Sequence, residues 1–430
     1  MRIIESSNRR AVGRLIDRRR ETDPAIARRI ARIVADVRHA GDAAVLRYAR
    51  RFDHLSQPVE VSRAEMQDGL RATEPELRRA LRTAAKHIRR IARRQVPRGW
   101  RATVTPGVEI EQRVAPLGRV GCYVPAGRYP LPSSLLMTVV PARVAGVPEV
   151  IVVCPHPDPT VLAAAAIAGV TRMFRLGGAQ AVAALAYGTA TVPTVDKIVG
   201  PGSAYVAAAK ALVAADCPID FHAGPTEIVI LATRGNPAWV AADLVAQAEH
   251  DPDAHAIVLT PDRGLAARVA EQIRSQLPAT GPAREAIRRH GVIVITASLH
   301  EAVDIANRIA PEHLVCDRDD VARRATRAGT VFVGAYGAQA AGDYATGSNH
   351  VLPTGGAARF RGGLSAADFV RVHSVQRITR GGLAALSPTI LPIAEAEGLA
   401  AHAESIRVRL RSRSSRGSLT PSSGGRRRSA

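Results

Sequence analysis

Short apolar runs alternate with alanine-rich stretches over the middle of the chain, and this alternation restricts the fold more than any other feature of the sequence. The runs are apolar almost throughout, as expected of strands that are covered by helices on both faces. Strands that alternate with helices in this way are typical of parallel sheets, so we predict an α/β fold. The runs read EVIVVCP, RMFRLGG, KIVG, EIVILA, AIVLT, VIVIT and TVFVGA.

Helical patterns flank this region. Apolar positions recur every three or four residues in PAIARRIARIVADVRHAG and ELRRALRTAAKHIRRIARRQ, so we predict that the first hundred residues are helical. A second helical stretch runs to about Arg409. The last residues, RVRLRSRSSRGSLTPSSGGRRRSA, hold too few apolar side chains to pack, and we predict a disordered basic tail over 411–430.

The chain is long enough for more than one core, because single cores stop growing at roughly 250 to 300 residues. One sheet-forming unit spans about 123–225, and another runs from about 226 to 334. No apolar run is long enough to cross a membrane, and the first residues lack the apolar core of a signal peptide, so we predict a cytoplasmic protein. The four cysteines are scattered inside apolar segments, which indicates buried thiols and not metal ligands.

The formal net charge of +21 raises the possibility of nucleic-acid binding. Lysine occurs only at positions 86, 197 and 210, so arginine carries nearly all of the positive charge. Aromatic residues make up 3% of the chain, too few for a base-stacking platform, and no zinc-finger, RNA-recognition or helix-turn-helix signature is present. We therefore expect no specific nucleic-acid partner and keep a basic nucleic-acid-binding protein only as a remote alternative.

A glutamate and a histidine, Glu312 and His313, are adjacent in NRIAPEHLV, between a helix-like segment and an apolar run. Pro311 disfavours helical geometry in the residue before it, so we expect the helix to end here and the pair to lie on a turn. Adjacent side chains outside a helix point in different directions and could serve one pocket in separate roles. The alternative is a solvated pair in a surface loop.

Three further places combine histidine with a carboxylate or an amide. Gln247 and His250 are three residues apart at the end of a predicted helix, a spacing that also fits ordinary capping of the helix end. Asp343 and His350 share a long segment, 335–359, that is rich in Gly, Asn and Pro. A C-terminal helix carries Glu397 and His402. A divalent metal would need about four such groups from distant parts of the chain, and Gln247, His250, Asp343 and His402 would supply them.

The G-x-G-x-x-G fingerprint of dinucleotide-binding proteins is absent from the sequence. Three other Gly-rich turns each precede a predicted helix: YVPAGRYPLPSS, LGGAQAVAAL and VGPGSAYVAAAK. Their backbone N–H groups could cradle a pyrophosphate. Equally, they could be tight turns between a strand and a helix, and the sequence alone leaves both interpretations open.

Taken together, these segments resemble one family, histidinol dehydrogenase, over residues 119–409. The resemblance rests on GCYVPAGRYPLPSSLLM, LGGAQAVAALAYGT, KIVGPGSAYVAAAK, AGPTEIVILA, DLVAQAEHDPDA, NRIAPEHL, GDYATGSNHVLPT and AEGLAAH, in that order. It implies two successive oxidations, from L-histidinol to L-histidinaldehyde and then to L-histidine, with two NAD⁺ reduced in turn.

The resemblance also implies roles for residues. His313 would be the base that takes the hydroxyl proton, and Glu312 would activate water for the second oxidation. One Zn²⁺ per subunit would be held by Gln247, His250, Asp343 and His402, and it would position the imidazole and amine of the substrate. Substrate contacts would come from Thr226, Gln247, His250, His313, Asp343, His350, Glu397 and His402. Cofactor contacts would come from Tyr123, Gln180 and Ser203.

The same resemblance implies two incomplete Rossmann-like parallel-sheet domains in an intertwined homodimer. We expect a helical segment at 1–22, a catalytic and metal-binding domain at 23–122 plus 226–367, and an NAD-binding domain at 123–225. A helical segment at 368–410 would reach into the active site of the partner, so that the sites are shared.

Three departures from the family pattern leave the substrate open. Ala126 stands where a second glycine is usual, Ser203 replaces asparagine, and Ala338–Gln339 replaces Pro-Glu. Gln339 removes a negative charge near the expected metal loop, which could weaken recognition of a cationic group. The alternative is therefore a related NAD-dependent dehydrogenase of another small alcohol, for example a sulfopropanediol-type substrate.

Overall fold

The computed structural model describes residues 1–17, 24–126, 129–222 and 224–411. They form two compact units, each considered separately below. Unit 1 comprises residues 1–96 and 116–370, and unit 2 comprises 97–115 with the chain from 371 onward. Most of the predicted tail lies outside the described residues. Among the residues that are described, none of the helices combines the length and the apolar character needed to cross a membrane.

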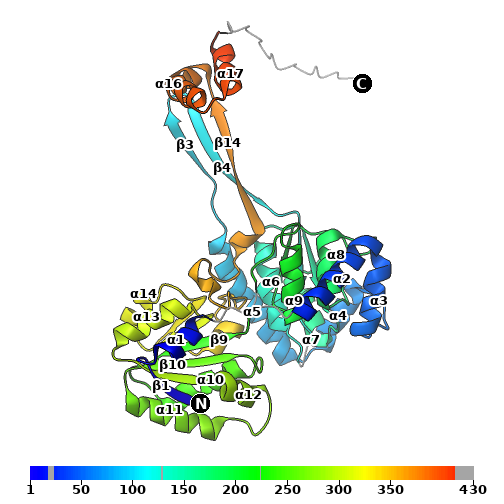
Figure 1. Ribbon diagram of the computed structural model, residues 1–430. Coiled ribbons are helices and arrows are strands. Elements are labelled where there is room, and N and C mark those ends of the chain that lie inside the picture. Colours follow the sequence, from blue (N-terminus) through cyan, green and yellow to red (C-terminus); the bar gives the residue numbers. More distant parts are fainter. Residues whose placement is uncertain (18–23, 127–128, 223, 412–430) are drawn as a thin grey trace, which may run out of the picture. The chain divides into compact units, whose positions relative to one another are not determined.

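The first sheet of unit 1 is entirely parallel, with the strand order β1-β11-β10-β9-β12-β13 (Figure 1). One face packs on α10, α11 and α12, and the other on α1, α13 and α14. The strands are β1 (Arg2–Glu5), β9 (Glu227–Leu231), β10 (His255–Thr260), β11 (Val292–Ile295), β12 (His313–Cys316) and β13 (Thr330–Val333). The helices are α1 (Arg9–Ile16), α10 (Pro237–Ala248), α11 (Arg263–Gln276), α12 (Pro282–His290), α13 (Leu299–Ile309) and α14 (Asp319–Arg324).

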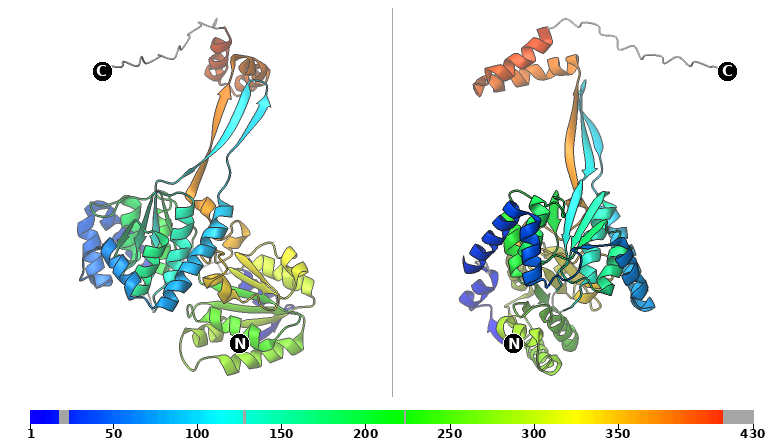
Figure 2. Two further views of the ribbon diagram at one scale, coloured as in Figure 1. Left: turned by 180° about the vertical axis from the view of Figure 1, so that it is seen from behind. Right: turned by 90° about the vertical axis from the view of Figure 1, so that its right-hand side faces the viewer.

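The second sheet of unit 1 has the strand order β2-β7-β6-β5-β8, and all neighbours are parallel except the pair β2 and β7. Helices α4, α5, α6 and α7 cover one face, and α2, α3, α8 and α9 cover the other (Figure 2). The strands are β2 (Glu60–Val61), β5 (Arg119–Tyr123), β6 (Glu149–Val153), β7 (Arg172–Phe174) and β8 (Lys197–Val199). The helices are α2 (Pro24–Ala40), α3 (Asp42–Phe52), α4 (Arg63–Ala72), α5 (Pro75–Gln95), α6 (Pro132–Val144), α7 (Pro159–Ala168), α8 (Gly178–Tyr187) and α9 (Ala204–Val213).

Burial on both faces explains the near-continuous apolar runs. Val150–Val153 of β6 and Ala256–Leu259 of β10 are fully buried, because helices cover both sides of each sheet. The surface helices bury one stripe only, as Ile30, Ile33 and Val37 do in α2. All four cysteines are free and buried, as predicted. The α/β prediction with two parallel sheets is confirmed.

Unit 2 contains a three-stranded sheet with the order β14-β4-β3 and two helices. The elements are β3 (Trp100–Thr105), β4 (Val108–Pro116), β14 (Val370–Ile378), α16 (Arg380–Ala396) and α17 (Ala400–Arg411). The segment 368–410 was expected to be helical, but Val370–Ile378 form β14. VRVHSVQRI mixes valine and isoleucine with polar residues without a continuous apolar run, as suits a strand whose faces are largely exposed.

Two other boundaries differ from the expected ones. Residues 1–22 were expected to be helical, but Arg2–Glu5 form β1, which pairs with β11 at the edge of the first sheet. Residues 23–122 were expected with the first sheet, yet α2, α3, α4 and α5 pack on the second sheet. The segment 335–359 is not a bare loop, because it contains α15 (Gln339–Tyr344) and a 3₁₀ turn at Ala357–Arg359, and another 3₁₀ turn follows at Ala366–Phe369.

Candidate active site

The Glu-His pair lies at the amino edge of the first sheet. Helix α13 ends at Ile309, as predicted from the proline, and Ala310 caps it in a left-handed conformation. His313 is the first residue of β12 and pairs with Ile228 of β9. Because β9 and β12 are parallel neighbours, Thr226, Glu312 and His313 meet at the same edge of the sheet.

Both members of the pair are buried, with exposed fractions of 7% for Glu312 and 3% for His313. The alternative of a solvated surface pair is therefore wrong. Glu312 Oε2 accepts hydrogen bonds from Thr226 Oγ1 at 2.5 Å and from the Glu227 N–H at 3.0 Å. His313 Nδ1 lies 3.7 Å from the same carboxylate oxygen. The carboxylate is thus fixed from one side by β9 and faces the imidazole on the other.

Burial and mutual attraction set the ionisation of the pair. Burial raises the pKa of the Glu312 carboxyl, although His313, Thr226 and Glu227 partly oppose the change. Burial by itself would lower the pKa of His313, but the carboxylates of Glu312 and Asp343 outweigh it and raise the pKa. The histidine is therefore a stronger proton acceptor than a free imidazole, which suits a general base.

Asp343 of α15 faces the same imidazole. Its Oδ1 lies 3.8 Å from His313 Nε2, and its Oδ2 accepts a hydrogen bond from Gln339 Nε2 at 2.5 Å. Burial would raise the pKa of Asp343, but the neighbouring His313 more than offsets this and lowers it. His350 Nδ1 lies 3.0 Å from the main-chain oxygen of Asp343, and burial lowers the pKa of His350.

Gln247 joins this group from the end of α10. Its side chain is fully buried, and its Nε2 donates a hydrogen bond to Thr226 Oγ1. Its Oε1 has no hydrogen-bond partner among the described residues. His250 follows two residues after the end of α10 and lies close enough to act electrostatically on Glu312, Asp343 and His350.

The four expected zinc ligands do not all lie in one unit. Gln247, His250 and Asp343 belong to unit 1, whereas His402 is an exposed residue of α17 in unit 2, and Glu397 caps α16 in the same unit. Within the part of the chain that the structure describes, no group of three or more His, Cys, Asp or Glu side chains is arranged to hold a metal. The buried, unpartnered Oε1 of Gln247 does fit a metal, because a bound cation would use this acceptor.

The expected cofactor residues lie at the carboxyl edge of the second sheet. The chain runs from β5 to β6 and β7 on one side and places β8 on the other side, so the strand order reverses between β5 and β8. Open α/β sheets bind ligands outside the carboxyl ends of the strands at such a point. Tyr123 ends β5, Gln180 lies in the first turn of α8, and Ser203 precedes α9 with an exposed side chain.

Protein acceptors already use the N–H groups of two Gly-rich turns. Gly177 donates to Asp53 Oδ2 at 3.0 Å, Gly178 to Tyr123 Oη at 3.0 Å, and Gly200 to Asp220 Oδ2 at 2.7 Å. The protein itself therefore occupies these three N–H groups, as in tight turns between a strand and a helix. Gly200 has a φ of +114°, and a Cβ there would lie 2.2 Å from the main-chain oxygen of Tyr123. Positions 127–128 of the first turn lie outside the described residues.

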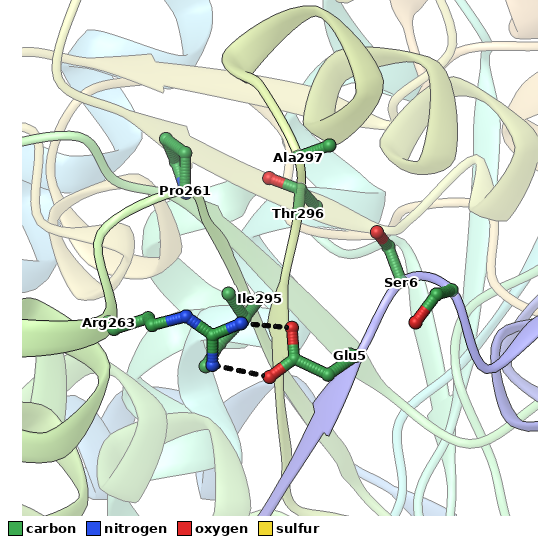
Figure 3. A pocket seen from close by; sticks show the side chains of 8 residues that line it. Glu5, Ser6, Pro261, Arg263, Ile295, Thr296 and Ala297 are labelled. Atoms are coloured by element: carbon green, nitrogen blue, oxygen red, sulfur yellow. Dashed lines mark hydrogen bonds and ion pairs between the residues drawn. The ribbon is translucent and has the colours of Figure 1, made fainter.

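A separate cavity of about 350 Å³ lies at the opposite, carboxyl edge of the first sheet (Figure 3). It is lined by residues at the ends of β1, β10 and β11, including an ion pair between Glu5 and Arg263 at 2.6 Å. None of the predicted site residues lines it. The edge of the sheet that carries Glu312 and His313 is therefore the better candidate for the chemistry.

Known proteins match the chain over almost its whole length. A family model described as histidinol dehydrogenase matches residues 16–410. The chain belongs to the histidinol dehydrogenase family. A histidinol dehydrogenase from Methanothermobacter thermautotrophicus is 45% identical over 96% of this chain and 99% of its own, and one from Aromatoleum aromaticum is 47% identical over 91% and 93%. The crystal structure of histidinol dehydrogenase from Elizabethkingia anophelis superposes with a TM-score of 0.90, at 32% identity, over 95% of this chain and 98% of its own.

The departure at Gln339 has a local explanation in this member of the histidinol dehydrogenase family. Gln339 is 1% exposed and donates to Asp343. A glutamate in the same place would set a second carboxylate against Asp343. The amide therefore stabilises the ionised form of Asp343 by a hydrogen bond.

Sequence reasoning missed Glu227, a second buried carboxylate at this edge. It is 1% exposed at the start of β9, and its Oε1 accepts the Gly355 N–H at 3.1 Å. The signal was an acidic residue at the head of the apolar run TEIVILA. Asp53, which contacts Gln180, was also missed. Nothing in RRFDHLS indicates that this residue packs against a turn that lies more than a hundred residues further along the chain.

Proposed function

We propose that the protein oxidises L-histidinol to L-histidine through L-histidinaldehyde, in the last steps of histidine biosynthesis. The observation that carries this proposal is the buried Glu312 and His313 pair, fixed at the amino edge of the first sheet between Thr226 and Asp343. Family membership supports the substrate. A cytoplasmic location stays a prediction.

In the first oxidation, His313 takes the hydroxyl proton of the substrate, and its proximity to Glu312 and Asp343 stabilises the imidazolium that forms. In the second oxidation, Glu312 takes a proton from the water that attacks the aldehyde. Two bases suit the two steps because the protons come from different oxygens. NAD⁺, when bound, accepts the hydride of each oxidation.

We further propose that Gln247, His250 and Asp343 hold a zinc ion together with His402 of a second subunit. The ion would supply a positive charge that orients the imidazole and amine of the substrate. Thr226 and His350 complete the substrate site from the same unit. Glu397 would pair with the substrate ammonium group across the dimer.

The composition of unit 2 supports the homodimer. Its buried residues, among those described, are Val108, Gly382, Ala394 and Ala403, too few to form a core. Large apolar side chains of the unit are exposed, including Trp100, Val104, Ile393 and Val408. A surface of this kind indicates an interface, and we propose that a second copy of the chain covers it.

An assay of purified protein tests the substrate. With L-histidinol, NAD⁺ and zinc, two equivalents of NADH should form per substrate consumed. The assay should be run beside other small alcohols, sulfopropanediol included. If the enzyme oxidises another alcohol but not L-histidinol, the protein is the alternative dehydrogenase and the histidinol proposal is wrong. If it oxidises no alcohol in the panel, both proposals are wrong.

A further inference from the structure

The geometry points to Asp53 as a positioning residue for cofactor binding, which acts by holding Gln180 and the Gly177 turn. This inference rests on the proposed use of NAD⁺ at the carboxyl edge of the second sheet. Asp53 lies in the connection that follows α3, far in sequence from Tyr123, Gln180 and Ser203.

Asp53 contacts the candidate cofactor residue directly. Its Oδ2 accepts hydrogen bonds from Gln180 Nε2 at 2.9 Å and from the Gly177 N–H at 3.0 Å. Asp53 is 7% exposed and Gln180 only 1%, so water does not compete for these bonds. The first bond fixes the rotation of the Gln180 amide and leaves its oxygen as the atom that can accept a hydroxyl or amine donor of a dinucleotide.

The turn itself is built around this carboxylate. A Cβ at Gly177 would lie 2.9 Å from Asp53 Oδ1 and 2.8 Å from Pro155 Cγ. The next N–H, from Gly178, is taken by Tyr123 Oη. Asp53 and Tyr123 therefore fix successive peptide groups, and the position of Gln180 depends on both.

Three features at and beside Asp53 are energetically unfavourable. Asp53 caps the carboxyl end of α3, where the helix dipole disfavours negative charge. Burial raises the pKa of Asp53 despite the two donors. His54, the next residue, has a φ of +47°, in the left-handed region that residues other than glycine rarely adopt. Costs of this kind collect at functional positions.

The test compares NAD⁺ affinity, measured by calorimetric titration, in the wild-type enzyme and in Asp53→Ala and Asp53→Asn. Asp53→Ala should weaken NAD⁺ binding about tenfold or more, which corresponds to the loss of a hydrogen bond to a charged group, while L-histidinol affinity is unchanged. Asp53→Asn should keep most of the wild-type NAD⁺ affinity, because the amide oxygen of asparagine can accept the same two hydrogen bonds. NAD⁺ affinity in Asp53→Ala equal to that of the wild type would overturn the inference.

A matched control separates positioning from general destabilisation. Asp317 Oδ2 also accepts N–H groups, here the backbone N–H of Thr233 at 3.0 Å and of Arg234 at 2.9 Å, together with the Thr233 hydroxyl at 3.0 Å, but it directly follows β12 of the first sheet. Asp317→Ala should lower the melting temperature without weakening NAD⁺ binding. An equal loss of NAD⁺ affinity in Asp317→Ala would overturn the assignment of a specific role to Asp53.

A second test exchanges the donor and the acceptor between Gln180 and Asp53, and it applies even if Asp53→Ala does not fold. Gln180→Glu alone sets two carboxylates together and should weaken NAD⁺ binding. Addition of Asp53→Asn should recover part of the affinity, because the amide N–H of the new side chain can donate to the introduced carboxylate while its oxygen takes over the Gly177 N–H. Failure of the double variant to recover would overturn the inference. If the wild-type enzyme itself does not bind NAD⁺, the proposed function fails and not merely the role of Asp53.

Discussion

At the scale of single residues, the site consists of side chains that are buried together, so each one affects the hydrogen bonding and the pKa of its neighbours. Thr226 shows this most clearly, because its hydroxyl donates to Glu312 and accepts from Gln247. The sequence singled out Glu312 and Gln247, and the family resemblance added Thr226, but neither indicated that one hydroxyl connects them. Such a chain of hydrogen bonds holds the carboxylate of Glu312 in place before any substrate arrives.

Asp243 of α10 offers a test of burial at the same scale. Burial raises the pKa of Asp243 to about 6 from its ordinary 3.8. A raised carboxyl pKa means that the folded state opposes the charged form, so the residue lowers stability as pH rises from about 4 through 6. Because the side chain is only half-buried, Asp243→Asn should stabilise the protein at pH 7.5 by roughly 1 kcal/mol after allowance for solvent screening.

Urea unfolding at several pH values measures this effect. The advantage of Asp243→Asn should shrink as the pH falls from about 6 toward about 3, because the carboxyl becomes protonated in the folded state below about pH 6 and in the unfolded state only below its ordinary pKa of 3.8. A pH-independent difference between the two proteins would contradict the role assigned to burial.

At the scale of elements, the sequence predicted the helices and strands whose apolar residues are buried in a regular pattern. The apolar runs of β6, β7, β8, β9, β10, β11 and β13 and the amphipathic helices α2 and α5 are where the patterns indicate. The strands of unit 2 were missed, since β3 and β14 are largely exposed and their polar residues gave no apolar run. Strand β1 was missed because four residues are recognisable only through their pairing with β11.

The Gly-rich turns illustrate what the sequence leaves open at this scale. LGGAQ and VGPGS fit a phosphate cradle and a tight turn equally well as sequences. The difference lies in which group occupies their N–H donors, and those groups, Asp53 and Asp220, come from distant segments. Long-range acceptors of this kind are not visible in a local pattern.

At the scale of the whole molecule, the resemblance supplied what the residues alone could not. His402 and Glu397 belong to a unit with almost no core, and no local signal connects them with Gln247. If the active sites are shared, a variant that lacks His402 and a variant that lacks His313 should complement each other. A random mixture of His402→Ala and His313→Ala subunits should recover about a quarter of wild-type activity, because half of the dimers carry one intact site of two.

The mixture is made by denaturation and refolding together, and each variant refolded alone is the control. Activity that stays at the level of the separate variants would place all four metal ligands within one chain.

The division of work between His313 and Glu312 is the central claim, and Glu312→Gln tests it most directly. The variant keeps an oxygen that can accept the hydrogen bonds from Thr226 and Glu227 but loses the base for water. Alcohol oxidation and aldehyde oxidation are measured separately, with L-histidinol and with L-histidinaldehyde as substrates. We predict that aldehyde oxidation slows at least tenfold more than alcohol oxidation, in the range expected for the loss of a general base. An equal loss in both steps would contradict the account.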